Sequence, residues 1–341
     1  MKPLFLTSLL AAVFTLQTTL PLAAADAPKK LLVVTTTTGF RHSSIPTLEK
    51  VIAQLGKDSG AFTVDLVQQP PDQPNEVRKP APLSADVTDE QKAAFQGAQD
   101  RYTAFLAARG KWNDAMKAAL QKLSPESLKN YDAVAFVSTT GELPIPDPQG
   151  LLDWIKAGHA FIGIHAASDT FHRWPAYIDM LGGEFEHHGA QLGVECLNQD
   201  PQHPATAHLG KSWTISQEEI YQFKNYDATK VHDLLILDKH PENNSPGHFP
   251  VSWCKNYGEG RVFYTSLGHR EDIWDADPNI PNRKNSAEIS KAYEAHILGG
   301  IEWALGLKPD AGAPKASAQN AVPIVDSKAM SKAGSQAAPG K

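Results

Sequence analysis

The sequence predicts an α/β fold, in which a mostly parallel β-sheet is covered by helices on both of its faces. Two observations predict this class. Strand-like runs alternate with helix-like segments through the first half of the chain, as they do when crossover helices connect parallel strands. The strand-like runs are also continuously apolar, which is typical of parallel strands that are buried on both sides.

The individual elements follow from apolar runs and from the helical spacing of apolar side chains. Strands are predicted over residues 31–36, 62–67, 131–137 and 160–164, and then, where the pattern becomes more strand-like, over 193–197, 213–215, 219–223, 231–237, 251–254 and 261–266. Helices are predicted over 46–55, 148–157 and about 286–305. The main domain is therefore expected to span residues 26–307.

One insertion interrupts the alternation. The stretch 69–83 is polar and rich in Pro, and residues 88–123 are rich in Ala and Lys with apolar side chains at helical spacing. The pattern predicts a helical insertion at about 70–123, most simply a helical hairpin. Beyond Leu307 the chain consists mainly of small and polar residues without periodicity, so a disordered tail is predicted over 308–341.

The first residues have the features of a secretory signal. A basic start at Lys2 is followed by an apolar run and by three alanines at 23–25, which predicts cleavage after residue 25. The alternative is a membrane anchor, but polar residues and Pro21 interrupt the run too often for it to span well. We therefore expect a secreted or periplasmic protein that does not contact the membrane after signal cleavage.

Charge and cysteine content narrow the expected partners. The formal net charge is −6 at pH 7 and no basic run is present, which disfavours binding to nucleic acid or anionic membranes. Cys196 and Cys254 are the two cysteines. A disulfide bridge and a pair of buried thiols are equally compatible with their strand-like surroundings.

The most informative position is His165. It follows the predicted strand 160–164 at a turn of small residues, where α/β hydrolases hold a nucleophile on a sharp strand-to-helix elbow. An imidazole at this point can bind a metal, transfer a proton or hydrogen-bond to a sugar, but it has no thiol for glutamine hydrolysis. The alternative is a histidine of the core with satisfied hydrogen bonds.

The loops after three predicted strands carry further imidazoles and carboxylates. In open α/β sheets, ligands bind beyond the carboxyl ends of the strands, so one histidine from each loop is expected to reach a shared crevice. His42 could instead cap the following helix, and Asp169 could be a helix N-cap. The candidates in these loops are Arg41, His42, His165, Ser168, Asp169, His269 and Glu271.

A divalent metal, zinc or a similar ion, is a second expectation. His187 and His188 are adjacent, and adjacent strand residues face opposite ways, so one of them is expected to reach the site, and we take His187. Together with His165 and His269 it would supply imidazole ligands, although no compact motif such as HExxH is present. No nucleotide is expected, because Gly182-Gly183 is not a dinucleotide-binding loop.

Aromatic residues near these loops suggest a carbohydrate ligand. Trp174 and Tyr221 offer apolar surfaces, and Glu219 offers a carboxylate, a combination that suits the apolar faces and hydroxyl groups of a sugar. Ordinary core packing is the alternative for the aromatic residues, and we favour it for Phe223.

Several of these motifs together resemble the ThuA-like, or trehalose-utilisation, family, over about residues 31–305. They are Gly39-Phe40-Arg41-His42-Ser43, the elbow 163–171, Trp174-Pro175, Gly182-Gly183, Glu219-Ile220-Tyr221 and the run 260–269. The resemblance implies the flavodoxin-like, doubly wound fold of class I glutamine amidotransferases. The cysteine elbow of those enzymes aligns with 163–167, so that His165 replaces the cysteine, and their late His-x-Glu pair aligns with His269 and Glu271.

The resemblance also implies a role in carbohydrate use, without glutaminase activity. We expect an exported enzyme that cleaves a trehalose-like or 3-keto-glycoside or eliminates its leaving group, with His165 and His269 as acid, base or metal ligands and Glu271 orienting His269. The expected substrate-binding residues are Arg41, His42, Ser168, Asp169, Trp174, Glu219 and Tyr221. The alternatives are a non-catalytic sugar-binding module and a subunit that acts beside a sugar oxidoreductase. A homo-oligomer is compatible with each of them.

Overall fold

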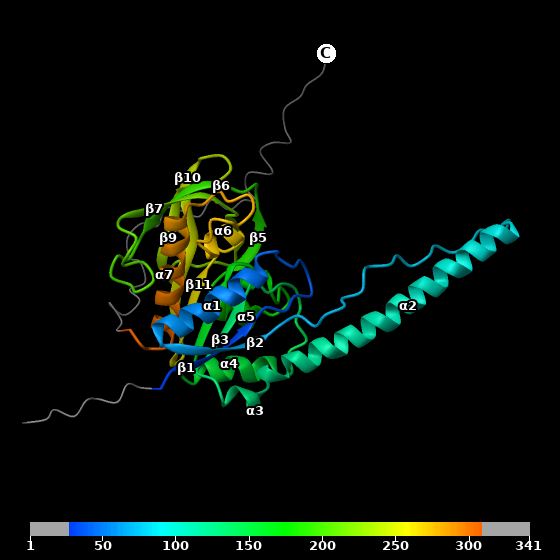
Figure 1. Ribbon diagram of the computed structural model, residues 1–341, viewed down its shortest axis with the longest axis horizontal. Coiled ribbons are helices and arrows are strands. Elements are labelled where there is room, and N and C mark those ends of the chain that lie inside the picture. Colours follow the sequence, from blue (N-terminus) through cyan, green and yellow to red (C-terminus); the bar gives the residue numbers. More distant parts are fainter. Residues whose placement is uncertain (1–26, 309–341) are drawn as a thin grey trace, which may run out of the picture.

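A nine-stranded mixed sheet forms the centre of the molecule (Figure 1). The computed structural model describes residues 27–308, so the predicted signal peptide and all of the predicted tail except Lys308 lie outside the described residues. The sheet has the order β2-β1-β3-β4-β11-β10-β9-β6-β7. Its parallel half consists of β1 (Lys29–Val34), β2 (Phe62–Val67), β3 (Ala133–Val137), β4 (Ala160–Ile164) and β11 (Gly260–Thr265).

The predicted α/β class is confirmed, and the parallel half has the strand order of flavodoxin-like sheets. An antiparallel half extends it and is made of β6 (Leu192–Asn198), β7 (Ser212–Glu218), β9 (His232–Lys239) and β10 (Pro246–Tyr257). A separate two-stranded sheet pairs β5 (Glu184–His188) with β8 (Tyr221–Lys224). All strands predicted from the sequence are present.

Side chains of the parallel strands point alternately into two cores. Leu31 and Val33 of β1 belong to one cluster, and Leu32 and Val34 belong to the other, because successive strand residues face opposite sides of a sheet. All four are fully buried, and burial of each such side chain contributes about 1.5–3 kcal/mol. Both faces of the sheet must therefore be covered.

Helices cover both faces. Residues of α1 (Ile45–Ser59) and α7 (Ala287–Ala304) belong to the first cluster, and residues of α4 (Pro148–Lys156) and α5 (Pro175–Leu181) belong to the second. Shorter helical pieces are η1 (Leu120–Leu123), α3 (Pro125–Leu128), η2 (His165–Asp169) and α6 (Glu271–Trp274). None of the helices within residues 27–308 combines the length and apolarity that a membrane crossing needs.

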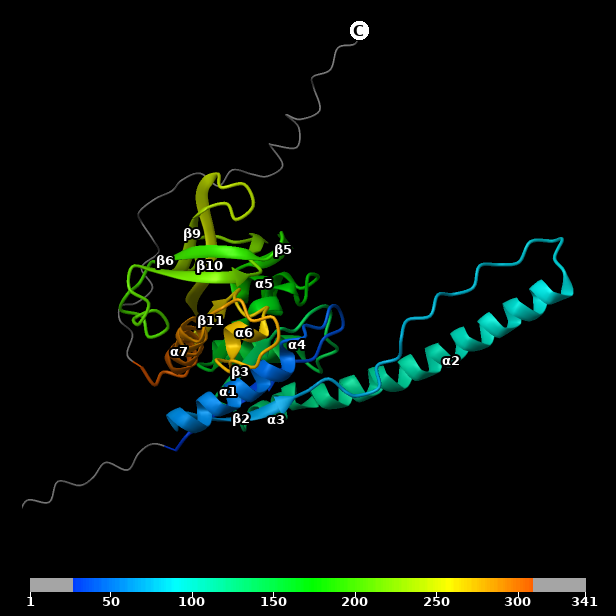
Figure 2. The same cartoon turned by 45° about the horizontal axis from the view of Figure 1, so that its top comes forward.

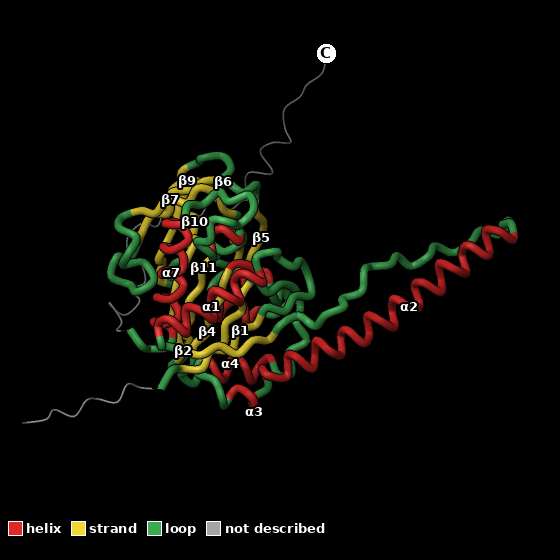
Figure 3. The backbone as a smooth tube through the Cα atoms, viewed as in Figure 1, coloured by secondary structure: helices red, strands yellow, loops and turns green. Residues whose placement is uncertain are grey.

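The insertion is a single long helix, so the predicted helical hairpin is wrong. Helix α2 (Asp89–Ala119) has 31 residues, which at ~1.5 Å per residue makes it about 46 Å long. Residues 68–88 run back along it as an extended segment, and the two form an arm that projects from the body (Figures 1 and 2). Figure 3 shows the arm as one helix and one loop.

The sequence of the extended segment explains the difference. Its prolines lack the backbone N–H that a helix requires, and helix α2 begins only after them, at Asp89, with Thr88 as its N-cap. The Thr88 hydroxyl accepts a hydrogen bond from the backbone of Gln91, whose side chain bonds back to Thr88, a capping box that fixes the start of a helix. Near the body, Trp112 Nε1 donates to the Pro70 carbonyl over 3.1 Å.

Cys196 and Cys254 form no disulfide with one another. They lie on β6 and β10, which β9 separates in the sheet. Both side chains are buried, so of the two alternatives that the sequence left open, the structure has the pair of buried thiols.

Candidate functional site

Three parallel strands, β1, β4 and β11, bring one histidine each to the same edge of the sheet. His42 lies in the loop between β1 and α1, His165 directly follows β4, and His269 lies in the loop between β11 and α6. The three imidazole rings are neighbours, with centroids 4.6 Å apart for His42 and His165, 5.2 Å for His42 and His269, and 5.4 Å for His165 and His269. The predicted meeting of these side chains at one site is confirmed.

The backbone makes a sharp elbow at His165. This residue has φ of 52°, a left-handed conformation that non-glycine residues rarely adopt, and it begins the short helix η2. Small residues allow the chain to turn here: a Cβ atom on Gly163 would lie only 2.8 Å from Leu181 and 2.9 Å from Tyr264. Local strain of this kind is common at functional sites.

The loop that carries His42 is attached to the His269 loop. Ser44 precedes α1 without capping it through its side chain, and its hydroxyl instead donates to the Gly268 carbonyl over 3.3 Å. The Nε2 of His42 lies 3.1 Å from that of His165, and its Nδ1 makes no hydrogen bond that could cap the helix. The helix-capping alternative for His42 therefore does not hold.

Hydrogen bonds fix the proton positions of His165. Its Nδ1 lies 2.7 Å from the Ser266 carbonyl oxygen, which can only accept, so Nδ1 carries the hydrogen and Nε2 presents a lone pair. The Tyr221 hydroxyl and His42 Nε2 each lie 3.1 Å from this Nε2, whose single lone pair accepts one hydrogen bond at a time. The ring is therefore neutral and its free nitrogen faces the centre of the cluster.

Glu219 is the carboxylate of the cluster. One oxygen, Oε2, lies 3.1 Å from His269 Nδ1 and 3.7 Å from His165 Nε2. The other, Oε1, lies 3.2 Å from His188 Nδ1. Glu219 thus connects the buried imidazoles to His188, whose side chain is 43% exposed.

The neighbouring Glu218 holds two backbone segments of the site together. Its Oε1 accepts the backbone N–H of Glu219 over 2.8 Å and that of His269 over 3.2 Å. The side chain is completely buried, and this burial raises the pKa of the carboxyl to about 7. Sequence reasoning missed Glu218, because no local pattern distinguishes it from an ordinary strand residue.

Burial and mutual proximity keep two of the imidazoles neutral. Burial, followed by the charge of His269, lowers the pKa of His42 to about 4. Burial, followed by His42, moves the pKa of His165 well below its ordinary value. For His269 burial acts in the same direction, but the hydrogen bond and charge of Glu219 outweigh it and raise the pKa. The site therefore combines two neutral imidazoles with one carboxylate and a third imidazole, His269, whose protonated form that carboxylate favours.

The structure corrects the choice between the two adjacent histidines of β5. His187 points away from the cluster, where its Nε2 lies 3.8 Å from Glu242, while His188 faces Glu219. The expectation that His187 contributes to a metal site is therefore wrong. A register shift between Phe185 and His187 disturbs the pairing of β5 with β8, and simple alternation does not predict which residue faces inward past such a bulge.

Glu271 does not orient His269, contrary to the expectation. It stands in the first turn of α6, from which its Oε1 accepts a hydrogen bond from Ser43 Oγ over 2.5 Å. Glu219 takes the predicted role instead, through its contact with His269. The two carboxylates are far apart in the sequence, and only the folded chain brings Glu219 to the imidazole.

Of the predicted substrate-binding residues, His42, Glu219 and Tyr221 lie at the cluster, and the side chains of four others make no hydrogen bond to its imidazoles or its carboxylate. The Arg41 guanidinium donates to the Thr35 carbonyl over 2.9 Å. Ser168 is buried and bonds to the Tyr264 hydroxyl over 2.8 Å, so it supports the elbow instead of facing a ligand.

Asp169 and Trp174 lie beyond the elbow. Asp169 Oδ1 is 2.7 Å from His172 Nε2, and it ends η2 instead of capping a helix start. The Trp174 ring stacks on Tyr177 at a centroid distance of 5.7 Å, as a partly buried neighbour of the second core cluster. Phe223 packs against that cluster as well, in agreement with the core interpretation.

The cluster fits a divalent metal ion of the zinc type. His42, His165, Glu219 and His269 each offer one ligand atom, and these atoms lie within 4.8 Å of one another. Neutral imidazole nitrogens and a carboxylate oxygen are ligands that zinc prefers, at about 2.0–2.2 Å each. The carbonyl of Ser266 orients His165 from behind, as second-shell acceptors do for histidines that bind metals.

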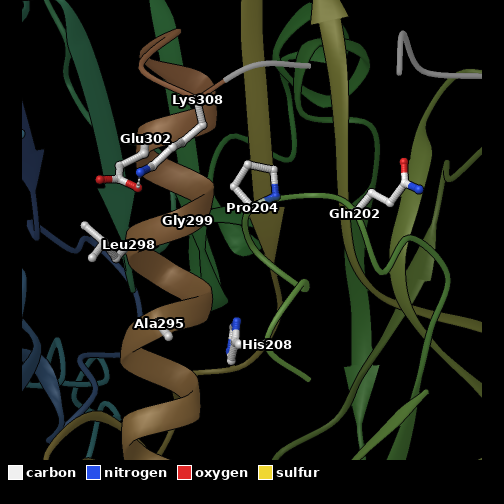
Figure 4. Close-up of a pocket in the computed structure, with 8 residues that line it drawn as sticks. All are labelled: Gln202, Pro204, His208, Ala295, Leu298, Gly299, Glu302 and Lys308. Carbon is white, nitrogen blue, oxygen red and sulfur yellow. Dashed lines mark ion pairs between the residues drawn. The ribbon is translucent and has the colours of Figure 1, made fainter. Parts of the chain in front are cut away.

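A surface pocket that is separate from the histidine cluster lies beside α7. It has a volume of about 360 Å³, between α7 and the loop 202–208 (Figure 4), and contains none of the four cluster residues. Its lining is Gln202, Pro204, His208, Ala295, Leu298, Gly299, Glu302 and Lys308. Figure 4 shows the Glu302 and Lys308 side chains joined as an ion pair at its edge, over 3.5 Å. The chemistry of the cluster does not depend on this pocket.

Comparisons with known proteins agree with this description. A family model named ThuA, described as trehalose utilisation, matches residues 87–304. A ThuA-like protein from Parabacteroides merdae is similar in structure, with a TM-score of 0.55 and 20% identity over 84% of this chain and 94% of that one. Another, from Bacteroides uniformis, gives a TM-score of 0.51 and 18% identity over 86% and 98%. No curated protein matches the chain.

Proposed function

We propose, from the premise that this chain belongs to the ThuA family, that it is an enzyme acting on a glycoside of the trehalose or 3-keto type. The observation that carries the proposal is the convergence of His42, His165, His269 and Glu219 at the carboxyl edge of the sheet. This edge is where open α/β sheets bind their ligands. Imidazoles and a carboxylate are the groups that acid–base chemistry on a sugar requires.

A divalent metal would be held by these four residues. When bound, the ion supplies a Lewis acid that polarises a keto or hydroxyl oxygen of the sugar. The chain contributes the orientation: Ser266 fixes the tautomer of His165, and Glu218 fixes the backbones of Glu219 and His269. Because His42 and His165 are buried, substrate would approach from the side of His269 and His188, whose side chains are 21% and 43% exposed.

Elimination is the reaction that suits this arrangement best. In a 3-keto-glycoside the C2 proton is acidic because it lies next to the ketone. The His188 imidazole, which lies on the open side and outside the four metal ligands, accepts that proton, the electron pair forms a C1–C2 double bond, and the bond from C1 to the glycosidic oxygen breaks. The leaving oxygen then takes up a proton and departs as an alcohol, so that the sugar is cleaved without any change in oxidation state.

We also propose that the protein acts outside the cytoplasm and receives its substrate from a partner enzyme. The N-terminal segment predicts export, so the glycoside would be met outside the cytoplasm. A 3-keto sugar must be made by an oxidation, so a sugar oxidoreductase is the partner class that would supply it. Association of this chain into a homo-oligomer is compatible with the proposal and does not alter the chemistry.

The experiment has three readouts on the purified protein. Elemental analysis of untreated protein is expected to find a transition metal close to one equivalent, and a chelator is expected to remove it and lower the unfolding temperature. Incubation with trehalose and 3-keto-trehalose is expected to give product from the keto sugar, at a rate that falls after chelation. A failure to turn over any such sugar, with saturable binding in calorimetry, would instead establish the alternative, a sugar-binding module.

A further inference from the structure

We propose that Phe40 forms a binding subsite for a sugar ring, a stacking surface that positions the pyranose over the histidine cluster. This inference rests on the proposed function and adds a specificity-determining residue to it. It starts from one feature that the chemistry of the cluster does not explain, an aromatic ring exposed to solvent beside buried imidazoles.

Phe40 is exposed far beyond the usual extent for its residue type. Its exposed fraction is 65%, and among the large apolar residues that are exposed within 27–308 it is the one aromatic, the others being Leu83, Leu106 and Leu307. A single exposed apolar side chain is ordinary on a protein surface. The position of this one, and the rigidity of its backbone, argue for a specific role.

The ring of Phe40 lies directly against the cluster. Its centroid is 4.8 Å from that of His42 at an interplanar angle of 83°, and His42 in turn contacts His165 and His269. The three consecutive side chains diverge: Arg41 reaches back to the Thr35 carbonyl, His42 enters the cluster, and Phe40 stays at the surface. A ligand bound at the open side of the cluster, beside His269, would therefore lie one imidazole ring away from Phe40.

The backbone beneath Phe40 is firmly held. Its carbonyl accepts a hydrogen bond from the Thr140 hydroxyl over 2.7 Å, and the N–H of Thr38 donates to the Thr140 carbonyl over 3.0 Å. The loops after β1 and β3 approach so closely that a Cβ atom on Gly141 would lie 2.5 Å from Thr38 Oγ1 and 3.0 Å from the Gly39 nitrogen. Phe40 is therefore an exposed ring on an ordered support, which limits the entropy lost when a ligand binds.

The chemistry of a pyranose matches this surface. One face of the ring presents C–H groups, which pack on an aromatic face, while the hydroxyl groups at its edge remain free for polar partners. Stacking on Phe40 would leave the keto or glycosidic oxygen directed at His42 and His269. The subsite is thus expected to recognise the apolar face of the sugar and not its charge.

The test compares Phe40 variants with a matched surface control. Phe40→Ala removes the ring, Phe40→Trp keeps an aromatic surface, and Leu106→Ala removes a similarly exposed apolar side chain from α2. Trehalose and 3-keto-trehalose serve as probes in calorimetry and in turnover assays. Metal content and unfolding temperature are measured for each variant, and both are expected to equal the wild-type values because Phe40 is exposed.

We expect Phe40→Ala to raise the dissociation constant and KM by about 5- to 20-fold with little change in kcat, while Phe40→Trp and Leu106→Ala stay within about 2-fold of wild type. In proton NMR the ring C–H signals of the bound sugar should shift upfield with wild type and Phe40→Trp, and lose that shift with Phe40→Ala. Equal affinity and equal shifts for Phe40→Ala would overturn this inference alone. A wild-type protein that neither binds nor converts these sugars would overturn the proposed function and the subsite with it.

Discussion

At the scale of single residues, the site depends on supporting hydrogen bonds that fix the orientation of its histidines. His165 presents its Nε2 because the Ser266 carbonyl binds its Nδ1, and His269 faces the cluster because Glu218 holds its backbone. Such supporting contacts fix both the tautomer and the direction of a ligand. Substitutions at the supports and at the imidazoles should therefore have different and separable effects.

Replacing His165 tests the centre of the cluster. His165→Ala is expected to lose the bound metal and at least about 100-fold in turnover, because it removes a nitrogen that faces His42, Glu219 and Tyr221. Elemental analysis and a rate assay with 3-keto-trehalose measure the two effects. The matched control is His187→Ala, an adjacent but outward-facing imidazole, which should keep both properties. Retention of metal and rate in His165→Ala would contradict the assignment.

Glu218 allows a second test at this scale. Glu218→Ala leaves the backbone N–H groups of Glu219 and His269 without their acceptor, and each unsatisfied buried donor costs about 1–3 kcal/mol. Glu218→Gln retains a carbonyl oxygen in the same place and should cost clearly less, about 1 kcal/mol. Urea unfolding of both variants provides the comparison. Equal losses would show that the negative charge, and not the acceptor, is what matters.

At the scale of elements, the arm is the feature that departs most from a standard α/β domain. Helix α2 buries only Trp112 and Met116, both toward the body, and the rest of the helix is accompanied by the extended segment 68–88 (Figure 2). In proteins, most of the stability of a helix comes from tertiary packing of its apolar face. We therefore expect the anchored end to contribute most of the stability of α2.

The buried contacts of Trp112, which attach α2 to the body, lead to a testable prediction. Trp112→Ala is expected to lower the free energy of unfolding by about 3–5 kcal/mol, because it removes a large buried ring together with its hydrogen bond to Pro70. Leu106→Ala, further along the same helix and 50% exposed, should change it by less than about 0.5 kcal/mol. Chemical denaturation followed by circular dichroism measures both variants. A small effect of Trp112→Ala would mean that the arm is fixed by contacts other than this one.

At the scale of the whole molecule, a buried carboxylate connects the segments around α6 to the sheet. Asp272 is completely buried and accepts hydrogen bonds from Arg270 and from the backbone and side chain of Asn285. Asn285 in turn donates to the Gln217 carbonyl of β7. The late helices and the antiparallel half of the sheet are therefore joined through one charged group.

The contribution of the ionised Asp272 carboxylate to the free energy of unfolding should depend on pH. Burial of Asp272 opposes ionisation, but the hydrogen bond from Arg270 and those from Lys284 and Asn285 outweigh it and lower the pKa. A lowered carboxyl pKa adds stability above the unfolded value of about 3.9 and loses it as the pH falls through the folded value. Asp272→Asn should therefore be less stable than wild type at pH 7, and the gap should shrink below about pH 4. Thermal unfolding across this range tests it, and a gap independent of pH would exclude the ionised group as its source.

Much of the fold was determined by the sequence alone. Apolar runs such as Leu31–Val34 and the elbow strand 160–164 are buried between two layers of helices, so local composition identified the class of sheet and every strand of the nine-stranded sheet, but not the polar strand β5. The meeting of His42, His165 and His269 was also predictable, because the carboxyl ends of parallel strands share one edge.

The tertiary structure alone decided the partners of these residues. That Glu219 and not Glu271 faces His269, that His188 and not His187 faces Glu219, and that the insertion extends as one helix all depend on contacts between segments distant in the sequence. Periodicity reports which side of its own element a residue occupies. Periodicity contains no information on a bulge in a paired strand or on the path of a neighbouring loop. It also does not show which of two carboxylates, Glu219 or Glu271, lies beside His269.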